Sequence, residues 1–331
     1  MCCFFLILAK GNILFMNQTL LLLLTLACFS GNAQKKVTAA TYKVEEKSVA
    51  ATLKFLSSDA LQGRLAGSKG LETAAQYLED VFVKNGVKPY FASYKDTLTN
   101  FDKTTYNVVG YLEGADPKLK NEFVVFGAHY DHIGIEKNPT ATDSIYNGAN
   151  DDASGVTTVA ELVNYFGKTK NNKRSILFCF FSAEEAGLLG SQSLAEKLKK
   201  QNFNLYAMLN FEMVGVAMQR DILAYLTGYG ASTMGEKINE YAGKKLVGYL
   251  DVEMKYQLFR RSDNFSFYNE FKKPSQTICT FDFENFAYYH KVEDEFEGMD
   301  IKHMTAFIQE MVPVTDKMVN AKGEDIVMKA K

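Results

Sequence analysis

The feature that most constrains the fold is an apolar run, residues 176–181, followed closely by two adjacent glutamates, Glu184 and Glu185. A continuous run of β-forming apolar residues is typical of a strand that is buried on both faces of a parallel sheet. Two carboxylates at the end of such a strand repel each other, and burial disfavours their ionised forms. Because ligands bind at the carboxyl ends of the strands in open α/β sheets, we predict that Glu184 and Glu185 face a metal ion.

The first 33 residues form a strongly apolar segment in which Lys10 is the only charged residue. The stretch from Leu20 to Phe29 is short for a membrane span, and the small residues before Gln34 suit cleavage by a signal peptidase. The segment therefore predicts a signal peptide at residues 1–33, with Met16 as an alternative start.

The body of the chain is predicted to be exported, to a periplasmic or extracellular location. The alternative to cleavage is a membrane anchor, with lipid attachment at Cys28. Residues 34–331 are enough for a single domain with a full core, and we expect a monomer without a membrane span after cleavage. The net charge of −2 and the lack of a basic patch argue against a nucleic-acid partner. Cys179 and Cys279 lie in apolar runs and are expected to be buried thiols.

Strand-like apolar runs alternate with helical spacing of apolar residues along the body of the chain. The predicted strands are 106–112, 122–128, 175–181, 205–211 and 276–281. The predicted helices are one ending near Ser57, one from Leu71 toward Gly86, 154–166, 191–199, 233–242, and a last one from Ile301 that Pro313 breaks or kinks. This alternation predicts an α/β three-layer sandwich, with a mixed, mainly parallel sheet and helices on both faces.

Clusters of polar residues follow the predicted strands or precede the next helix. These clusters are 129–132, 147–152, 184–185, Glu212 alone, and 288–290, and they contain three of the four histidines. Histidine and carboxylate at separate strand ends are the ligand types of a catalytic zinc site with an open position. For Asp151 and Asp152 the alternative is a helix N-terminal cap. Carboxylates that converge without a cation would repel by up to roughly 4 kcal/mol per pair at 4 Å, which favours a metal site.

Five of these segments resemble the motifs of the secreted bacterial di-zinc aminopeptidases, in the same order and at similar spacing. They are 127–132, 150–155, 182–191, 210–213 and 289–294, and residues 56–64 also resemble the amino-terminal segment of that family. The resemblance covers roughly residues 50–320 and implies a zinc-exopeptidase fold that acts on peptide substrates. It implies two Zn²⁺ ions held by His129, Asp151, Glu185, Glu212 and His290.

The same resemblance implies a role for each member of this set. Asp151 would bridge the two ions, with His129 and Glu212 completing one site and Glu185 and His290 the other. A second group would serve catalysis: Glu184 as general base, Asp131 as the residue that orients the His129 imidazole, and Tyr289 as a hydrogen-bond donor to the tetrahedral intermediate. The Asp151–Asp152 peptide would be cis.

The chain departs from the family pattern in three places. Glu212 stands where the studied aminopeptidases usually carry aspartate, and Asn264 stands where relatives often have histidine. The connection between Gly86 and Tyr106 is too short for the protease-associated insert of larger relatives, so we expect a single zinc peptidase domain.

Three other functions compete with the aminopeptidase interpretation. A glutaminyl cyclase of similar fold would use one zinc ion, which Asp151, Glu185 and His290 could hold. A carboxypeptidase would need cations for the substrate carboxylate, for which the adjacent Arg260 and Arg261 are candidates. The third is a metal-free binding protein, which the intact ligand set argues against.

Overall fold

The computed structural model describes residues 37–137 and 143–330, and from Thr38 onward the chain forms one compact unit. The predicted leader, residues 1–33, lies outside the described residues and stays a prediction, as does lipid attachment at Cys28. Among the described residues, no helix combines the length and the apolar character that a membrane crossing requires.

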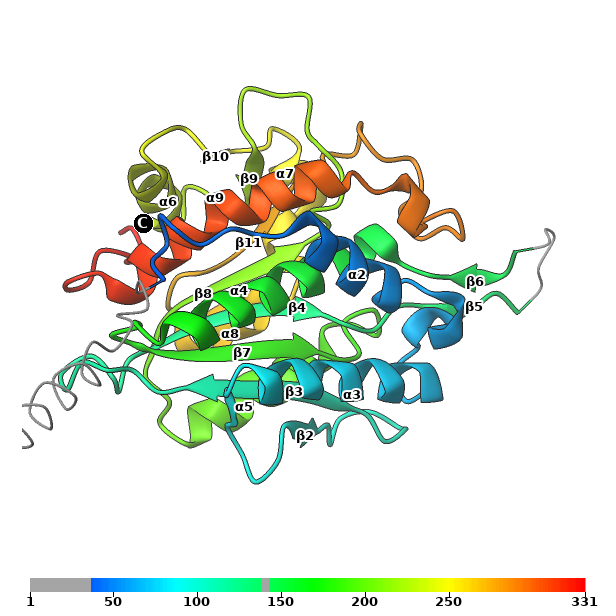
Figure 1. Ribbon diagram of the computed structural model, residues 1–331, viewed down its shortest axis with the longest axis horizontal. Coiled ribbons are helices and arrows are strands. Elements are labelled where there is room, and N and C mark those ends of the chain that lie inside the picture. Colours follow the sequence, from blue (N-terminus) through cyan, green and yellow to red (C-terminus); the bar gives the residue numbers. More distant parts are fainter. Residues whose placement is uncertain (1–36, 138–142, 331) are drawn as a thin grey trace, which may run out of the picture. The chain divides into compact units, whose positions relative to one another are not determined.

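A mixed sheet forms the centre of this unit (Figure 1). Its four central strands run parallel, in the spatial order β7 (Ser175–Phe181), β4 (Phe123–His129), β8 (Leu205–Glu212) and β11 (Ser275–Cys279). Antiparallel neighbours flank them: β3 (Tyr106–Leu112) beside β7, and β9 (Ala224–Leu226) beside β11. Short strands complete the edges: β1 (Lys88–Pro89) and β2 (Lys95–Thr97) pair with β3, and β10 (Val247–Gly248) pairs with β9. A separate two-stranded sheet pairs β5 (Gly134–Ile135) antiparallel with β6 (Ile145–Tyr146).

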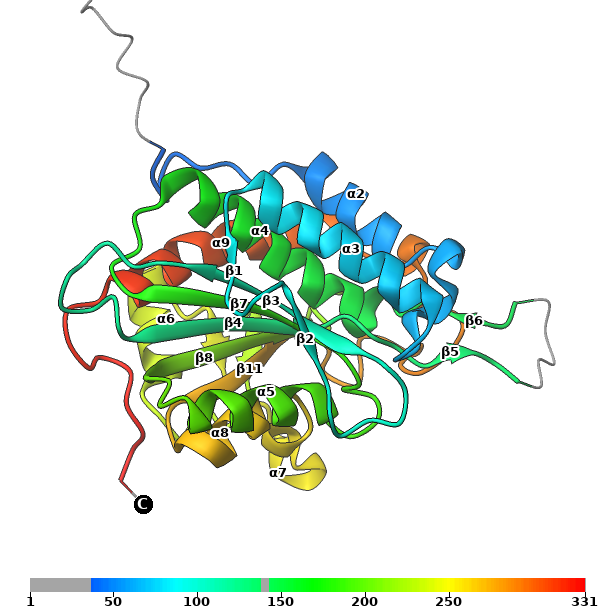
Figure 2. The same ribbon diagram turned by 90° about the horizontal axis from the view of Figure 1, so that it is seen from below.

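Helices cover both faces of the sheet, as Figure 2 shows. One face carries α2 (Glu46–Leu56), α3 (Lys69–Lys84), α4 (Gly155–Thr169) and α9 (Ile301–Asn320), and the other carries α5 (Leu189–Lys200) and α8 (Asn264–Phe271). The remaining helical segments are η1 (Asp59–Arg64), η2 (Ala149–Ser154), α6 (Met234–Ala242), α7 (Glu253–Tyr256), η3 (Leu258–Arg260) and η4 (Phe296–Gly298). The predicted α/β sandwich with a mixed sheet is confirmed.

Strand β7 explains why the core has two halves. Its side chains alternate, so that Phe178 and Phe180 pack into the core beneath α3 and α4, whereas Leu177 and Phe181 pack beneath α5 and α8. Every residue of β7 is buried, which is what a continuous apolar run between two helical layers requires. Cys179 and Cys279 are buried free thiols, as predicted.

The register of the central strands brings their carboxyl ends to one edge. His129, the last residue of β4, lies beside Phe181 at the end of β7. Glu212, the last residue of β8, lies beside Cys279 at the end of β11. Side chains far apart in the sequence therefore meet at this edge.

Two features differ from the sequence prediction. Of the two outcomes predicted at Pro313, a break or a kink, the break does not occur: helix α9 continues to Asn320. The buried Val312 and Val314 on either side keep packing against the core and offset the lost hydrogen bond. Helix α8 was not predicted, since it buries polar residues such as Asn264 and Ser266 alongside Phe267 and so lacks a clear apolar stripe.

Candidate metal centre

The residues at the strand ends are placed by turns with unusual backbone conformations. Ala183, Met213 and His290 have φ angles of 57°, 49° and 55°, in the left-handed region that non-glycine residues seldom adopt. Such a conformation costs about 1–3 kcal/mol and persists only where the surrounding structure enforces it. The turn at Ala183 immediately precedes Glu184, and the turn at Met213 immediately follows Glu212. The third turn contains His290 itself.

Asp151 lies at the centre of the cluster, in η2 just before α4. The Nε2 atom of His129 is 3.1 Å from its Oδ1, and the Nε2 atom of His290 is 3.2 Å from its Oδ2. One carboxylate therefore lies between the imidazole at the end of β4 and an imidazole from the loop that follows β11. The resemblance implied that Asp151 bridges two ions, and that role stays a prediction.

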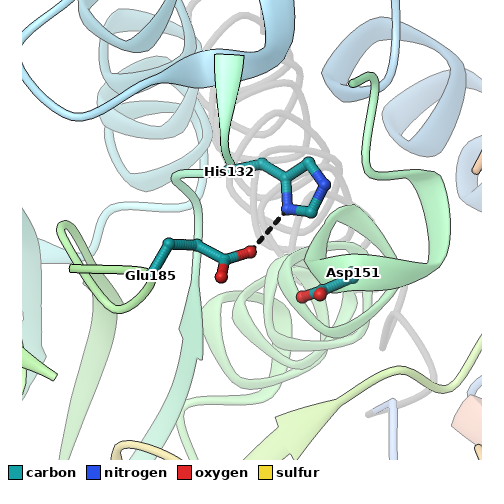
Figure 3. Close-up of side chains that lie close together, drawn as sticks. All are labelled: His132, Asp151 and Glu185. Carbon is teal, nitrogen blue, oxygen red and sulfur yellow. Dashed lines mark ion pairs between the residues drawn. The ribbon is translucent and has the colours of Figure 1, made fainter. Parts of the chain in front are cut away.

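Glu185 also contacts two imidazoles. Its Oε2 lies 3.1 Å from His290 Nε2, and its Oε1 lies 2.7 Å from His132 Nδ1. In Figure 3, His132, Asp151 and Glu185 converge on one another, and one potential ligand atom from each lies within 4.8 Å of the other two. The sequence assigned no role to His132, although it falls in the predicted 129–132 cluster.

His132 is buried, and within the described residues neither of its ring nitrogens makes a hydrogen bond of normal geometry. The 2.7 Å contact with Glu185 is close, but its angles are not those of a hydrogen bond, and Glu185 Oε1 is likewise left without a hydrogen-bond partner. Buried polar atoms without partners are costly, so these three atoms have unused capacity for a proton or a cation.

Glu212 is half-buried at the end of β8, and within the described residues its Oε2 atom has no hydrogen-bond partner. Burial raises the pKa of this carboxyl to about 7, although the nearby His129 imidazole favours the ionised form. Burial also raises the pKa of Glu184 well above its ordinary value against the effect of His129, and the neighbouring Glu212 raises it further. Both carboxyls therefore lie where added positive charge would be stabilising.

The imidazole contacts act in the opposite sense on Asp151. Burial alone would raise its pKa, but hydrogen bonds from His129 and His290 hold the pKa of Asp151 well below its ordinary value. Burial alone would lower the pKa of His290, but the carboxylates of Asp151 and Glu185 raise it to about 10. The cluster thus stabilises a cationic group beside Asp151.

Asp131 lies next to His129 but contacts it mainly through the main chain. The Nδ1 atom of His129 is 3.2 Å from the Asp131 carbonyl oxygen and 3.8 Å from the carboxylate. The carboxylate instead accepts a hydrogen bond of 3.1 Å from the backbone N–H of Glu184. Asp131 therefore links the His129 segment to the Glu184 segment.

Further carboxylates hold the backbone around Asp151. Asp294 accepts hydrogen bonds from the N–H groups of Asn150 at 2.8 Å and Asp151 at 3.0 Å. Asp152 accepts one from Met213 N–H at 3.0 Å, which ties η2 to the end of β8. The Asp151–Asp152 peptide is cis, as the resemblance implied.

Arg64 joins three segments beneath the cluster, and it is fully enclosed. Its guanidinium donates to the carbonyl oxygens of Tyr130 at 2.9 Å, Asn147 at 2.7 Å and Gly148 at 3.0 Å, and also to that of Leu56. Burial lowers the pKa of Arg64, an effect that the carboxylate of Asp294 opposes. The loop after β4 and the loop before η2 are therefore held to each other by one cation.

Asn264, which stands where relatives often have histidine, has a structural explanation. Its side-chain amide donates to the carbonyl oxygens of Phe259 at 3.1 Å and Ser275 at 3.2 Å. Its oxygen accepts from the Thr277 hydroxyl at 2.8 Å. The side chain is thus fully used in joining α8 to β11.

A pocket opens beside Glu212 and Tyr289. Tyr289 is partly exposed, and its ring stacks on His290 with centroids 4.0 Å apart. The remaining walls are largely apolar and aromatic: Met213, Tyr225, Tyr256, Leu258, Cys279, Phe281 and Phe283, with Thr227, Ser262, Thr277 and Arg261. A substrate group next to the cluster would find an apolar surface here.

The donor set fits zinc. Imidazole nitrogens and carboxylate oxygens are its usual protein ligands, and unpartnered buried atoms of His132, Glu185 and Glu212 lie in the cluster. An α/β sheet with such a cluster at the carboxyl ends of its parallel strands defines a metalloenzyme-like class of protein.

Comparison with known proteins agrees with this class. The sequence model of peptidase family M28 matches residues 107–315, more than half of the chain, and the chain belongs to that family. Leucine aminopeptidase 1 of Ajellomyces dermatitidis is 31% identical over 198 residues, which cover 57% of this chain and 50% of that protein. The chain thus spans about half the length of this curated relative.

Solved structures share the fold. A zinc aminopeptidase from Bacillus subtilis superposes with a TM-score of 0.65 at 15% identity, over 86% of this chain and 98% of that one. A glutaminyl cyclase from Bacteroides thetaiotaomicron superposes with a TM-score of 0.62 at 18% identity, over 82% and 98% of the two chains.

The contact between His132 and Glu185 leads to a prediction. His132→Phe keeps a ring of similar size but removes the nitrogen beside Glu185, and we expect zinc affinity to fall by about 10- to 100-fold, the usual cost of losing a partner of a metal ligand. His132→Asn keeps a nitrogen near the Nδ1 position and should lose less. Zinc titration against a competing chelator measures both.

His303→Phe is the matched control, because His303 lies on α9 and forms no ion pair with a carboxylate within the described residues. Equal zinc affinity of His132→Phe and the wild type would show that the contact has no effect on the metal.

Proposed function

We propose that the protein is a zinc-dependent aminopeptidase that removes amino-terminal residues from peptides. The observation that carries the proposal is the Asp151 carboxylate lying between the His129 and His290 imidazoles. In this proposal His129, Asp151 and Glu212 would hold one ion, and Asp151, Glu185 and His290 would hold the other. The family membership and the leucine aminopeptidase relative support the same activity.

Bound zinc ions would supply positive charge that lowers the pKa of water and polarises a carbonyl group. The side chain of Glu184 is partly exposed beside the cluster, and its carboxylate accepts a proton from the attacking water and passes it to the leaving nitrogen. The hydrogen bond from Glu184 N–H to Asp131 keeps this segment in place. The Tyr289 hydroxyl, at the rim of the pocket, donates to the oxyanion that develops on the substrate.

Substrates should need a free α-amine. Incubating the zinc-loaded protein with a peptide and its N-acetylated form should shorten only the free peptide, from the amino terminus, because the amine is the group that marks that end. Mass spectrometry of the products over time measures this. Equal cleavage of the acetylated peptide would contradict the proposal, and loss of carboxyl-terminal residues would favour the carboxypeptidase alternative.

A glutaminyl cyclase is the second candidate, because its structural relative shares the fold and one zinc ion would suffice. The close contacts of His290 with Asp151 and Glu185 provide such a three-ligand site. The same experiment includes a peptide that begins with glutamine. Loss of ammonia without loss of a residue would favour the cyclase.

The location and the state of assembly belong to the same proposal. The protein is exported after cleavage of residues 1–33, and the composition of that segment supports this cleavage. The mature protein is a monomer. Amino-terminal sequencing of the mature protein tests the cleavage site, and a start at Gln34 is expected.

A further inference from the structure

Arg261 brings a cation to an otherwise largely apolar pocket. It lines the pocket that also contains Glu212 and Tyr289, and its own side chain is exposed. The preceding residue, Arg260, lies outside this pocket and lines a different hollow with Phe259. The two adjacent arginines are therefore placed differently.

The side chain of Arg261 is unpaired in the described part of the chain. The other four arginines of the chain each have a partner: carbonyl oxygens for Arg64, carboxylates for Arg174 and Arg220, and an aromatic ring for Arg260. Within residues 37–137 and 143–330, the guanidinium of Arg261 has no hydrogen bond, ion pair or ring contact. Its five donors are available to a ligand in the pocket.

We infer that Arg261 recognises a carboxylate of the substrate in this pocket. The inference rests on the proposed function and specifies its substrate class, namely peptides that place a carboxylate close to the scissile bond. The carboxylate can come from the side chain of an acidic first residue or from the carboxyl terminus of a very short peptide.

The chemistry of the pocket suits such a group. A guanidinium binds a carboxylate through two parallel hydrogen bonds, which is the strongest common form of this pairing. The rings of Tyr256, Phe281 and Phe283 would pack against the methylene groups that carry the carboxylate and would exclude part of the water. Partial exclusion of water strengthens the ion pair relative to one on an open surface.

Two pairs of peptides separate the two sources. The first pair is glutamyl-dialanine amide and glutaminyl-dialanine amide, which differ only in the charge of the first side chain. The second pair is leucyl-alanine and leucyl-alanine amide, which differ only at the carboxyl terminus. We expect the charged member of one pair to be preferred by about 10- to 100-fold in kcat/KM, as for a hydrogen bond to a charged group.

Arg261→Gln should remove that preference and leave the uncharged peptides unaffected, whereas Arg260→Gln should retain it. Calorimetric titration of the zinc-loaded protein with the same four peptides measures binding independently of turnover. If no peptide is cleaved, the proposed function fails and the binding preference alone decides the role of Arg261. A preference in neither pair, or one that Arg261→Gln leaves unchanged, would overturn the inference.

Discussion

Glu184→Gln should lower kcat by about 100- to 10,000-fold, the usual contribution of a general acid–base group, while zinc content stays at the wild-type level. The amide keeps the size of the carboxylate but cannot accept a proton from water. The structure separates Glu184 from its neighbour, because Glu185 lies within 3.1 Å of His290 and 2.7 Å of His132, whereas no such contact is formed by the Glu184 carboxylate within the described chain. Initial rates and elemental analysis on the same sample measure both quantities.

Glu185→Gln is the matched variant, since it makes the same chemical change one residue away. It should lose zinc first and activity as a consequence, and excess zinc should restore part of the rate. If Glu184→Gln keeps a rate near that of the wild type, or is the variant that loses zinc, the assignment of the two glutamates is wrong.

Replacing Arg64 should have the largest effect on stability. Arg64→Met leaves the carbonyl oxygens of Leu56, Tyr130, Asn147 and Gly148 without their donor in a buried site. Because each unsatisfied buried group costs about 1–3 kcal/mol, we expect the free energy of unfolding to fall by at least about 3 kcal/mol. Arg64→Lys keeps the charge but has fewer donors, so its loss should be intermediate.

Urea unfolding of the chelated protein measures this effect apart from metal binding. Arg260→Met is the control, because this exposed arginine should change the free energy of unfolding by no more than about 0.5 kcal/mol. If Arg64→Met has the same free energy of unfolding as the wild type, the positions of the loops after β4 and before η2 do not depend on this cation.

The strands that place the site were predictable because their signal is local. The runs at 106–112 and 175–181 coincide with β3 and β7, since each consists mainly of apolar, β-forming residues and is bounded by polar residues. Helix α8 was not predictable from the sequence. Its buried Asn264 donates hydrogen bonds to the carbonyl oxygens of Phe259 and Ser275, and a buried polar side chain interrupts the apolar periodicity by which a helix is recognised. Pro313 likewise lies inside α9, because packing of this helix against the core outweighs the tendency of proline to end a helix.

The candidate site was likewise predictable only where its signal is local in the sequence. Strand ends, histidines and carboxylates are visible in the sequence, and the structure does bring His129, Asp151, Glu185 and His290 together. The supporting contacts are not visible, because each joins residues distant in the chain. Asp294 holds Asp151 from 143 positions away, and Arg64 reaches Gly148 across 84. No local pattern specifies such pairs.

The most direct test of the metal centre is the zinc content of the purified protein after reconstitution with excess zinc and removal of the unbound metal. Elemental analysis should find two zinc ions per chain. Chelation should then lower the melting temperature, because a ligand that binds only the folded state stabilises it. A single ion would contradict the paired site and favour the cyclase alternative, and a protein that retains no zinc and melts unchanged after chelation would contradict the metal centre altogether.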